Sequence, residues 1–185
     1  MRTTFTIFGL LALVLCVLFL VRRPPAQAEA DTPTNRKASA PEFPADTQWL
    51  WNKPLTLASL RGQVVVVHFW TVGCINCIHN YPVYKAWQEK YGDKGVKIVG
   101  VHTPEFTTEA DVPSIRAKVR ENGLKFPIAV DNDSRIWKAW DNHYWPSINL
   151  IDKKGRVRYH WDGELHLETA EGRRFASHID ELLAE

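Results

Sequence analysis

Two cysteines, Cys74 and Cys77, lie two residues apart in the stretch HFWTVGCINCIHNYP, residues 68–82. They stand where an apolar run typical of a buried strand gives way to a helical pattern. A sulfur in the first turn of a helix faces unpaired backbone N–H groups and the positive end of the helix dipole, and both stabilise a thiolate. The pKa of such a cysteine can fall from ~8.5 into roughly the 3.5 to 7.5 range. We therefore predict that Cys74 is a nucleophile and that Cys77, one turn later, is the resolving thiol.

The chemistry that fits this pair is thiol–disulfide exchange. The Cys74 thiolate would attack a disulfide sulfur, a mixed disulfide would form, and Cys77 would release the reduced substrate. A zinc site is less favoured, because it needs two further ligands and the chain has no second cysteine pair. The histidines that could complete such a site are His68, His79, His102 and His143. A purely structural disulfide is also disfavoured, because closing so small a loop stabilises a fold very little.

The composition fits one folded domain with no nucleic-acid partner. The chain has 185 residues, of which 45% are hydrophobic, enough for one core of ordinary size. Its formal net charge is +2, and acidic and basic residues are interspersed, as on solvated surfaces. No internal repeat is visible in the sequence.

The first part of the chain predicts a membrane segment followed by a linker. Residues 5–21 form an uncharged apolar run, close to the ~17 to 25 residues that a membrane span needs. We expect residues 1–21 to act as an anchor or uncleaved signal, with cleavage and secretion as the alternative. Residues 22–46 are rich in Pro, Ala and Thr and predict a disordered tether. The folded domain is predicted over residues 47–185.

Within that domain, predicted strands and helices alternate. Strands are expected at 49–57, 64–70, 96–103, 126–131, 147–152 and 156–161, and helices at 74–95, 111–122, 134–143 and 167–183. The strand at 64–70 is continuously apolar and should lie in the middle of the sheet, joined to the next strand by a right-handed crossover. Pro82 should kink the first helix. The sum is an α/β domain with a mixed sheet and helices on both faces.

Several motifs together resemble a known family. The segment VVVVHFWTVGCINC, Pro82 and the segment WPSINLIDKKGRV stand in the order and spacing of the thioredoxin superfamily. The longer set LTLASLRGQVVVVHFW, GVHTPEF, FPIAVDND and YWPSINLIDKKGRVRY is similar to TlpA-like, redoxin-related bacterial thiol-disulfide oxidoreductases, which are membrane-tethered or exported. The resemblance covers about residues 48–165.

The resemblance implies a thioredoxin-like fold and a set of site residues. Pro146 should be a cis-proline that faces the cysteine pair, and the backbone of Trp145 should pair with an extended client segment. Trp70 and Trp145 would flank the substrate groove, unless they are simply core aromatics. Ile75 and Asn76 would lie over the cysteines and tune the thiolate.

The resemblance also implies an activity and its partners. The chain would be a thiol-disulfide oxidoreductase with no cofactor beyond the Cys74–Cys77 disulfide. Relatives of this kind usually act as reductants fed by a membrane electron donor, so we expect the chain to reduce disulfides of exported proteins, with oxidation of its clients as the alternative. The redox domain would be membrane-anchored on the extracytoplasmic, periplasmic side, or secreted to the periplasm after signal cleavage.

The sequence departs from the family at two positions. His68 stands six residues before the nucleophile, where thioredoxin-like proteins commonly carry a buried Asp, and Asn80 stands where some TlpA-like proteins use a Glu. We hypothesise that His68 handles the proton of Cys77, because an imidazole can do so near neutral pH. The alternative is a core histidine bonded to a backbone carbonyl. Glu105 is a second candidate for the proton-handling task.

Two rival functions, a peroxidase and a copper chaperone, fit part of the same pattern. A peroxidase of the peroxiredoxin group would carry Pro and then Thr ahead of its reactive cysteine; Thr71 is present, but Val67 occupies the proline position. A copper chaperone could use Cys74, Cys77 and His143 as soft ligands. Such proteins in this fold generally separate their cysteines by three residues, whereas this chain separates them by two.

Overall fold

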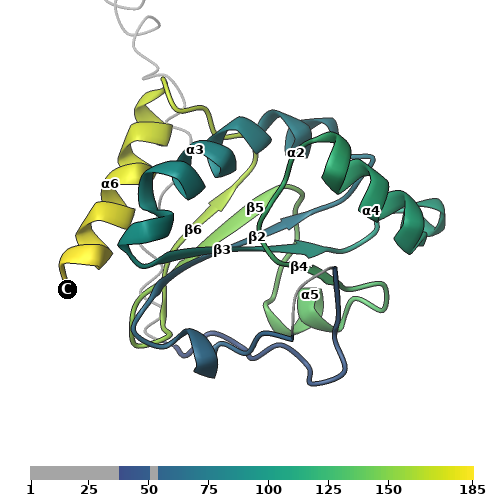
Figure 1. Cartoon of the computed structure of the whole chain (residues 1–185), viewed down its shortest axis with the longest axis horizontal. Coiled ribbons are helices and arrows are strands. Elements are labelled where there is room, and N and C mark those ends of the chain that lie inside the picture. Colours follow the sequence, from purple (N-terminus) through teal and green to yellow (C-terminus); the bar gives the residue numbers. More distant parts are fainter. Residues whose placement is uncertain (1–37, 51–53) are drawn as a thin grey trace, which may run out of the picture.

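The computed structural model describes residues 38–50 and 54–185, which form one mixed β-sheet covered by helices on both faces (Figure 1). The strands are β1 (Gln48–Leu50), β2 (Val64–Trp70), β3 (Val96–His102), β4 (Ile128–Val130), β5 (Ser147–Ile151) and β6 (Val157–Asp162). The α-helices are α2 (Ile75–His79), α3 (Tyr81–Tyr91), α4 (Val112–Glu121), α5 (Arg135–Ala139) and α6 (Ala170–Ala184). The predicted α/β class, with a mixed sheet and helices on both faces, is confirmed.

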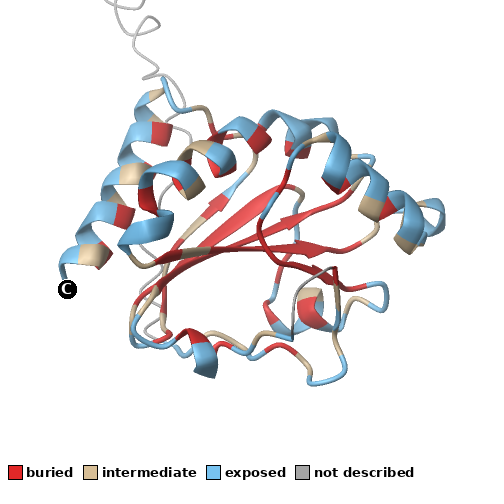
Figure 2. Cartoon of the chain, viewed as in Figure 1, coloured by how far each residue is buried: buried red, intermediate tan, exposed pale blue. Residues whose placement is uncertain are grey.

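The strand order is β1-β4-β3-β2-β5-β6, so β2 lies inside the sheet, as its apolar run predicts. It pairs in parallel with β3 and antiparallel with β5. All seven residues of β2 are buried, and Figure 2 shows the sheet as a buried layer between exposed outer helix faces. A strand that is covered on both sides can be apolar at every position, because neither face meets water.

Two hydrophobic cores lie on opposite faces of the sheet. Side chains of α2, α3, α4 and α6 pack on one face (Figure 1). The other face is covered by α5 together with residues 40–49 and 55–60, including the 3-10 turn η1 (Ala58–Leu60). Alternate residues of β2 enter the two cores: Val66 and Trp70 enter the first, and Val67 and Phe69 the second. The strand that leads into the cysteine pair is therefore held from both sides.

The predicted kinked helix over residues 74–95 is two helices, divided at Asn80. Pro82 lies in the first turn of α3, where its missing N–H leaves no hydrogen bond unmade. The buried Asn80 side chain donates to the Gly163 carbonyl at 3.2 Å and accepts from the Leu165 N–H at 2.7 Å. The break is thus fixed by an amide that joins it to the segment after β6, in addition to the proline.

The described domain begins before the predicted boundary at residue 47. Residues 38–46, assigned to the tether from their composition, contact the sheet: Ser39 bridges to Arg156, and Phe43 is buried against Trp140. The predicted anchor over residues 1–21 lies outside the described residues, as do residues 22–37 of the predicted tether. In the part of the chain that the structure describes, no helix has the length and apolarity of a membrane span.

Several predicted elements are shorter in the structure, among them the first strand and the last helix. The first strand, expected over 49–57, is limited to Gln48–Leu50, and residues 51–53 lie outside the described residues. The last helix begins at Ala170, capped by Thr169, whose hydroxyl accepts the Gly172 N–H at 3.1 Å. A side chain at Gly172 would collide with the His166 carbonyl, so this glycine permits a tight helix start.

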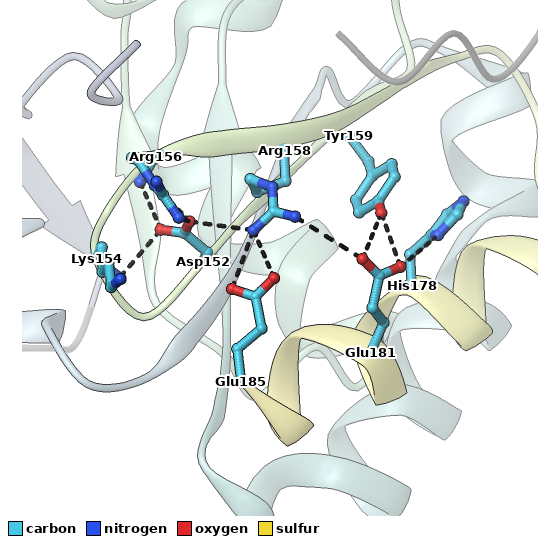
Figure 3. Close-up of polar contacts among 8 residues, drawn as sticks. All are labelled: Asp152, Lys154, Arg156, Arg158, Tyr159, His178, Glu181 and Glu185. Carbon is cyan, nitrogen blue, oxygen red and sulfur yellow. Dashed lines mark hydrogen bonds and ion pairs between the residues drawn. The ribbon is translucent and has the colours of Figure 1, made fainter. Parts of the chain in front are cut away.

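A network of charges ties the β5–β6 turn to the end of α6 (Figure 3). At its centre is Asp152, whose side chain is almost fully buried. Its carboxylate accepts the Arg156 N–H at 2.9 Å, pairs with the Arg156 guanidinium at 2.6 Å, and lies 3.4 Å from the Arg158 guanidinium. Arg158 continues the network to Glu181 and Glu185 on α6.

We expect Asp152→Asn to lower the free energy of unfolding by about 2 kcal/mol, because a neutral amide cannot replace the charged hydrogen bonds that the buried carboxylate accepts. Burial alone would raise the pKa of Asp152, but its hydrogen bonds from Arg156 and Arg158 hold the pKa below the usual value. A carboxyl with a lowered folded-state pKa stabilises the fold above its unfolded pKa of ~3.9, and this contribution is lost as pH falls through the folded value. Urea unfolding at pH 7 and at lower pH measures both effects.

Glu185→Gln is the matched control, because Glu185 pairs with the same network from a more exposed position. It should cost less than about 1 kcal/mol. An equal decrease in the free energy of unfolding for the two variants would show that burial of Asp152 does not increase its contribution to stability. An unfolding profile for Asp152→Asn that declines with acid as steeply as the wild type would contradict the pH argument.

Candidate active site

Strand pairing brings three loops to one edge of the sheet. Trp70 and His102, the last residues of β2 and β3, pair with each other, and Phe69 pairs with Ser147 at the start of β5. Residues 71–74, 103–106 and 144–146 therefore leave or enter the sheet at the same edge. Loops at the carboxyl ends of parallel strands are the usual place for chemistry in an open α/β sheet.

The two cysteines form a disulfide at this edge, with Cα atoms 5.2 Å apart. Cys74 caps α2 with an extended backbone, and its sulfur accepts the Cys77 N–H at 3.2 Å. Cys74 is half-buried, whereas the side chain of Cys77, which lies in α2, is buried in the hydrophobic core on that face of the sheet. This arrangement is the one expected if Cys74 meets the substrate and Cys77 completes the exchange.

Trp145 and Pro146 lie on the third loop. The Trp145–Pro146 peptide bond is cis, as the resemblance implied. The Trp145 indole N–H donates to the Thr103 carbonyl at 3.0 Å, and its ring stacks on Trp137 at 4.1 Å between centroids. The half-buried Trp145 is therefore held on the loop after β3, and Pro146 is buried behind it.

Trp70 does not line an open groove, which corrects one prediction. As the last residue of β2 it points into the core with Cys77 and makes edge contacts with Tyr81 and His102. A side chain that is 1% exposed cannot touch a client protein. The alternative considered for Trp70, a core aromatic, is the one the structure shows.

An exposed apolar rim lies on the loops around the cysteine pair. It consists of Ile75 at the start of α2, Phe106 on the loop after β3 and Tyr144 on the loop before β5, which are 59%, 62% and 61% exposed. Asn76, the other residue between the cysteines, is exposed as well. Large apolar side chains left in water beside a reactive pair are typical of a binding surface.

His68 is fully buried in the core under α3. Its ring stacks on Tyr84 at 4.0 Å and meets the edge of Phe126 at 5.1 Å. Neither ring nitrogen makes a hydrogen bond with the described residues, so the backbone carbonyl expected for a core histidine is not found there. Burial lowers the pKa of His68 to about 3, so the imidazole is neutral at physiological pH. A buried, neutral ring without a hydrogen-bond partner among the described residues disfavours the hypothesised proton-handling role, which the His68→Leu variant described below tests.

Sequence reasoning missed a carboxylate beside Gly73, the residue before Cys74. Glu109, in the 3-10 turn η3 (Thr107–Ala110), accepts the Thr71 hydroxyl at 2.8 Å and the backbone N–H of Glu105 at 2.8 Å. Glu105, the candidate taken from the sequence, is exposed and joins this site through its backbone. The signal that could have pointed to Glu109 is Gly73, because a side chain there would collide with the Glu109 carboxylate.

The turn before Cys74 is held by this carboxylate and by His102. The Val72 N–H donates to His102 Nε2 at 3.3 Å, so this nitrogen acts as an acceptor. Burial lowers the pKa of His102 to about 4, which keeps the ring neutral. Partial burial would raise the pKa of Glu109, but hydrogen bonds from Thr71, Glu105 and Phe106 outweigh it and lower the pKa, so Glu109 is ionised at neutral pH.

The other candidate ligands and proton carriers lie apart from this arrangement. Asn80, at the position where some relatives use a glutamate, is committed to the contacts that divide α2 from α3. His143 lies 3.2 Å from Asp141 on an exposed loop. Among the described residues, no three His, Cys, Asp or Glu side chains are grouped as a metal site would require.

The chain is similar to a protein family and to several characterised proteins. Residues 37–160 match the AhpC/TSA family. Protein DipZ of Mycobacterium tuberculosis is 44% identical over 130 residues, which cover 68% of this chain and 19% of DipZ. Thiol-disulfide oxidoreductase YkuV of Bacillus subtilis is 30% identical over 146 residues, which cover 78% of this chain and 94% of YkuV. The chain spans about a fifth or less of the first curated relatives it matches.

A solved structure agrees with these matches. The crystal structure of a thiol-disulfide isomerase from Corynebacterium glutamicum is similar, with a TM-score of 0.63 and 28% identity. The similarity covers 79% of this chain and 97% of that one. The crystal structure of the thioredoxin-like superfamily protein SPOA0173 is also similar, with a TM-score of 0.71 and 29% identity, and the similarity covers 80% of this chain and 97% of that one. The predicted thioredoxin-like fold is thereby confirmed.

Replacement of His68 by Leu tests the role of the buried imidazole. Because burial lowers its pKa to about 3, we expect the pH profile of insulin-disulfide reduction by His68→Leu to match the wild type between pH 6 and 9. The thermal midpoint serves as the check on folding. A profile displaced by more than about half a pH unit in a folded variant would instead support the proton-handling role.

Proposed function

This chain belongs to the AhpC/TSA family, and on that basis we propose that it reduces disulfide bonds of other proteins through Cys74 and Cys77. The predicted relationship to redoxin-like oxidoreductases is thereby confirmed. The observation that carries the proposal is the cysteine pair: a half-exposed sulfur at a helix start, bonded to a buried one. Relatives named as thiol-disulfide oxidoreductases support the same chemistry.

The reduced pair would act in two steps. The Cys74 thiolate attacks one sulfur of a client disulfide, a Cys74–client disulfide forms, and the other client sulfur leaves as a thiolate and takes up a proton. Cys77 then loses its proton and attacks the Cys74 sulfur, and the second client thiol is released. The client gains two electrons and two protons, and the protein ends with the Cys74–Cys77 disulfide. A dithiol donor must then reduce that disulfide.

The Cys77 backbone supports the first step. Its N–H donates to the Cys74 sulfur at 3.2 Å, which is the hydrogen bond that a thiolate at this position would use. Because Cys77 itself is buried, a client reaches Cys74 first, and the resolving thiol waits within bonding distance. Positioning of this kind replaces a bimolecular second step by an intramolecular one.

The apolar rim of Ile75, Phe106 and Tyr144 favours extended or unfolded client segments. Such segments expose apolar side chains that a folded protein buries. We propose that a client segment lies across this rim and pairs with the backbone at Trp145 as an added short strand. Clients would then be selected by accessibility and by apolar residues near the disulfide.

The direction and the place of the reaction are also part of the proposal. The apolar run at residues 5–21 supports an anchor or export signal, with the redox domain on the extracytoplasmic side. Disulfide-containing proteins of that compartment would be the clients. A membrane-embedded dithiol protein would be the electron donor, since a soluble cytosolic donor cannot reach that side.

Replacement of each cysteine in turn tests the mechanism. Cys74→Ser should lower the rate of insulin-disulfide reduction by more than about a thousandfold, because the nucleophile is lost. Cys77→Ser should retain the attack but accumulate a mixed disulfide with the client, which is detected as a shifted band on a non-reducing gel. Mass spectrometry then identifies the Cys74 adduct.

The outcome that would contradict the proposal is a folded wild-type protein that passes no electrons to insulin or to a small disulfide. Enzymatic consumption of peroxide by that same protein would favour the peroxidase alternative. Tight copper binding by the reduced protein that is lost in His143→Ala would favour the chaperone alternative.

A further inference from the structure

A carboxylate lies against the residue that immediately precedes the nucleophile. We propose that Glu109 acts as a fixed negative charge that shifts the Cys74–Cys77 pair toward its disulfide form and so makes it a stronger reductant. This inference rests on the proposed function, since it concerns the same pair. It identifies Glu109 as a residue that favours reduction of client disulfides over their formation.

The position of the carboxylate is set by three donors. Glu109 Oε2 accepts the Thr71 hydroxyl at 2.8 Å, the Glu105 N–H at 2.8 Å and the Phe106 N–H at 3.2 Å. These donors come from two of the three loops at the active edge, one following β2 and one following β3. A side chain with this many partners on one oxygen is held in a single place.

The other oxygen lies over the backbone before Cys74. Glu109 Oε1 occupies the space where a Cβ atom of residue 73 would stand, so a larger residue there would displace the carboxylate from this position. Gly73 is exposed and directly precedes Cys74, which is half-buried. The carboxylate is therefore next to the segment that carries the reactive sulfur.

The charge on Glu109 is not balanced by a cation at neutral pH. Among the described residues, no Lys or Arg forms an ion pair with it. The titratable group packed beside it is His102 of β3, which is neutral because burial lowers its pKa to about 4. The Glu105 carboxyl lies on the same loop but is exposed to solvent. The net charge beside Gly73 is therefore negative.

This charge acts on one side of the redox equilibrium. In the reaction of the Cys74–Cys77 disulfide with two glutathione thiols, the products are the Cys74–Cys77 dithiol and glutathione disulfide. The protein disulfide is neutral, whereas the reduced pair carries a thiolate on Cys74. A nearby carboxylate disfavours that thiolate and leaves the disulfide unaffected. It therefore opposes the stabilisation of the thiolate by the helix start and keeps the pair a better electron donor.

Glu109→Gln isolates the charge, because the amide oxygen of Gln can still accept the Thr71 hydroxyl and the two backbone N–H groups. We expect the equilibrium constant with glutathione to move about tenfold toward the dithiol, which corresponds to about 30 mV for a two-electron couple. The pKa of the Cys74 thiol in the reduced protein should fall by about one unit. Thiolate absorbance at 240 nm against pH measures the second change.

Glu105→Gln is the matched control, since it removes the same charge from the same loop without touching Gly73. It should change the equilibrium less than about twofold. Glu109→Asp keeps the charge but moves it away from Gly73 by the length of one methylene group. It should therefore shift the equilibrium constant with glutathione and the pKa of the Cys74 thiol in the same direction as Glu109→Gln, by a smaller amount. This second variant decides the matter if Glu109→Gln does not fold.

Two results would overturn the inference. One is a folded Glu109→Gln with an equilibrium constant within twofold of the wild type; the other is an equal shift in Glu105→Gln. Either leaves the proposed function intact as long as the wild type reduces insulin. A wild-type protein that reduces no disulfide would instead reject the proposed function, whatever the variants do.

Discussion

The pairing of β2 with β3 on one side and β5 on the other is the constraint from which the site follows. The register of these pairs brings the end of β2, the end of β3 and the start of β5 to one edge. Burial on both faces then holds β2 in place, because a slip by one residue would exchange the residues of the two cores. The cysteine pair, the carboxylate and the cis-proline loop meet because the sheet has this register.

The parts of this arrangement that depend on local pattern could be predicted from the sequence. The apolar strand at 64–70, the cysteine pair at a helix start and the hairpin of β5 and β6 each rest on residues that are neighbours in the chain. The resemblance added the cis bond before Pro146, which no local rule supplies. Pro82 predicted the place where the helix is interrupted, but it predicted a kink and not a division into two helices. That division also depends on Asn80 and its hydrogen-bond partners some 80 residues away.

The parts that could not be predicted depend on contacts between distant segments. Glu109 lies 35 positions after Cys74 with no motif between them, and only the fold of the loop after β3 brings it to Gly73. The choice of Glu105 from the same loop shows that sequence could find the segment but not the side chain that turns inward. Trp70 illustrates the opposite error: an aromatic next to the motif belonged to the core, because strand alternation points it under α2 and α3.

The segment before β1 has a consequence for dividing the protein into parts. Composition alone separates residues 22–46 from the domain, yet Phe43 fills a space between Trp49 and Trp140, and Glu42 accepts the Leu57 N–H at 2.6 Å. Loss of a buried phenylalanine from such a site costs about 3 to 5 kcal/mol. A fragment cut at residue 47 would also uncover the outer edge of β6, where the Val157 N–H donates to the Ala38 carbonyl at 3.3 Å, and an uncovered strand edge invites association between molecules. Soluble fragments should therefore begin before Ala38.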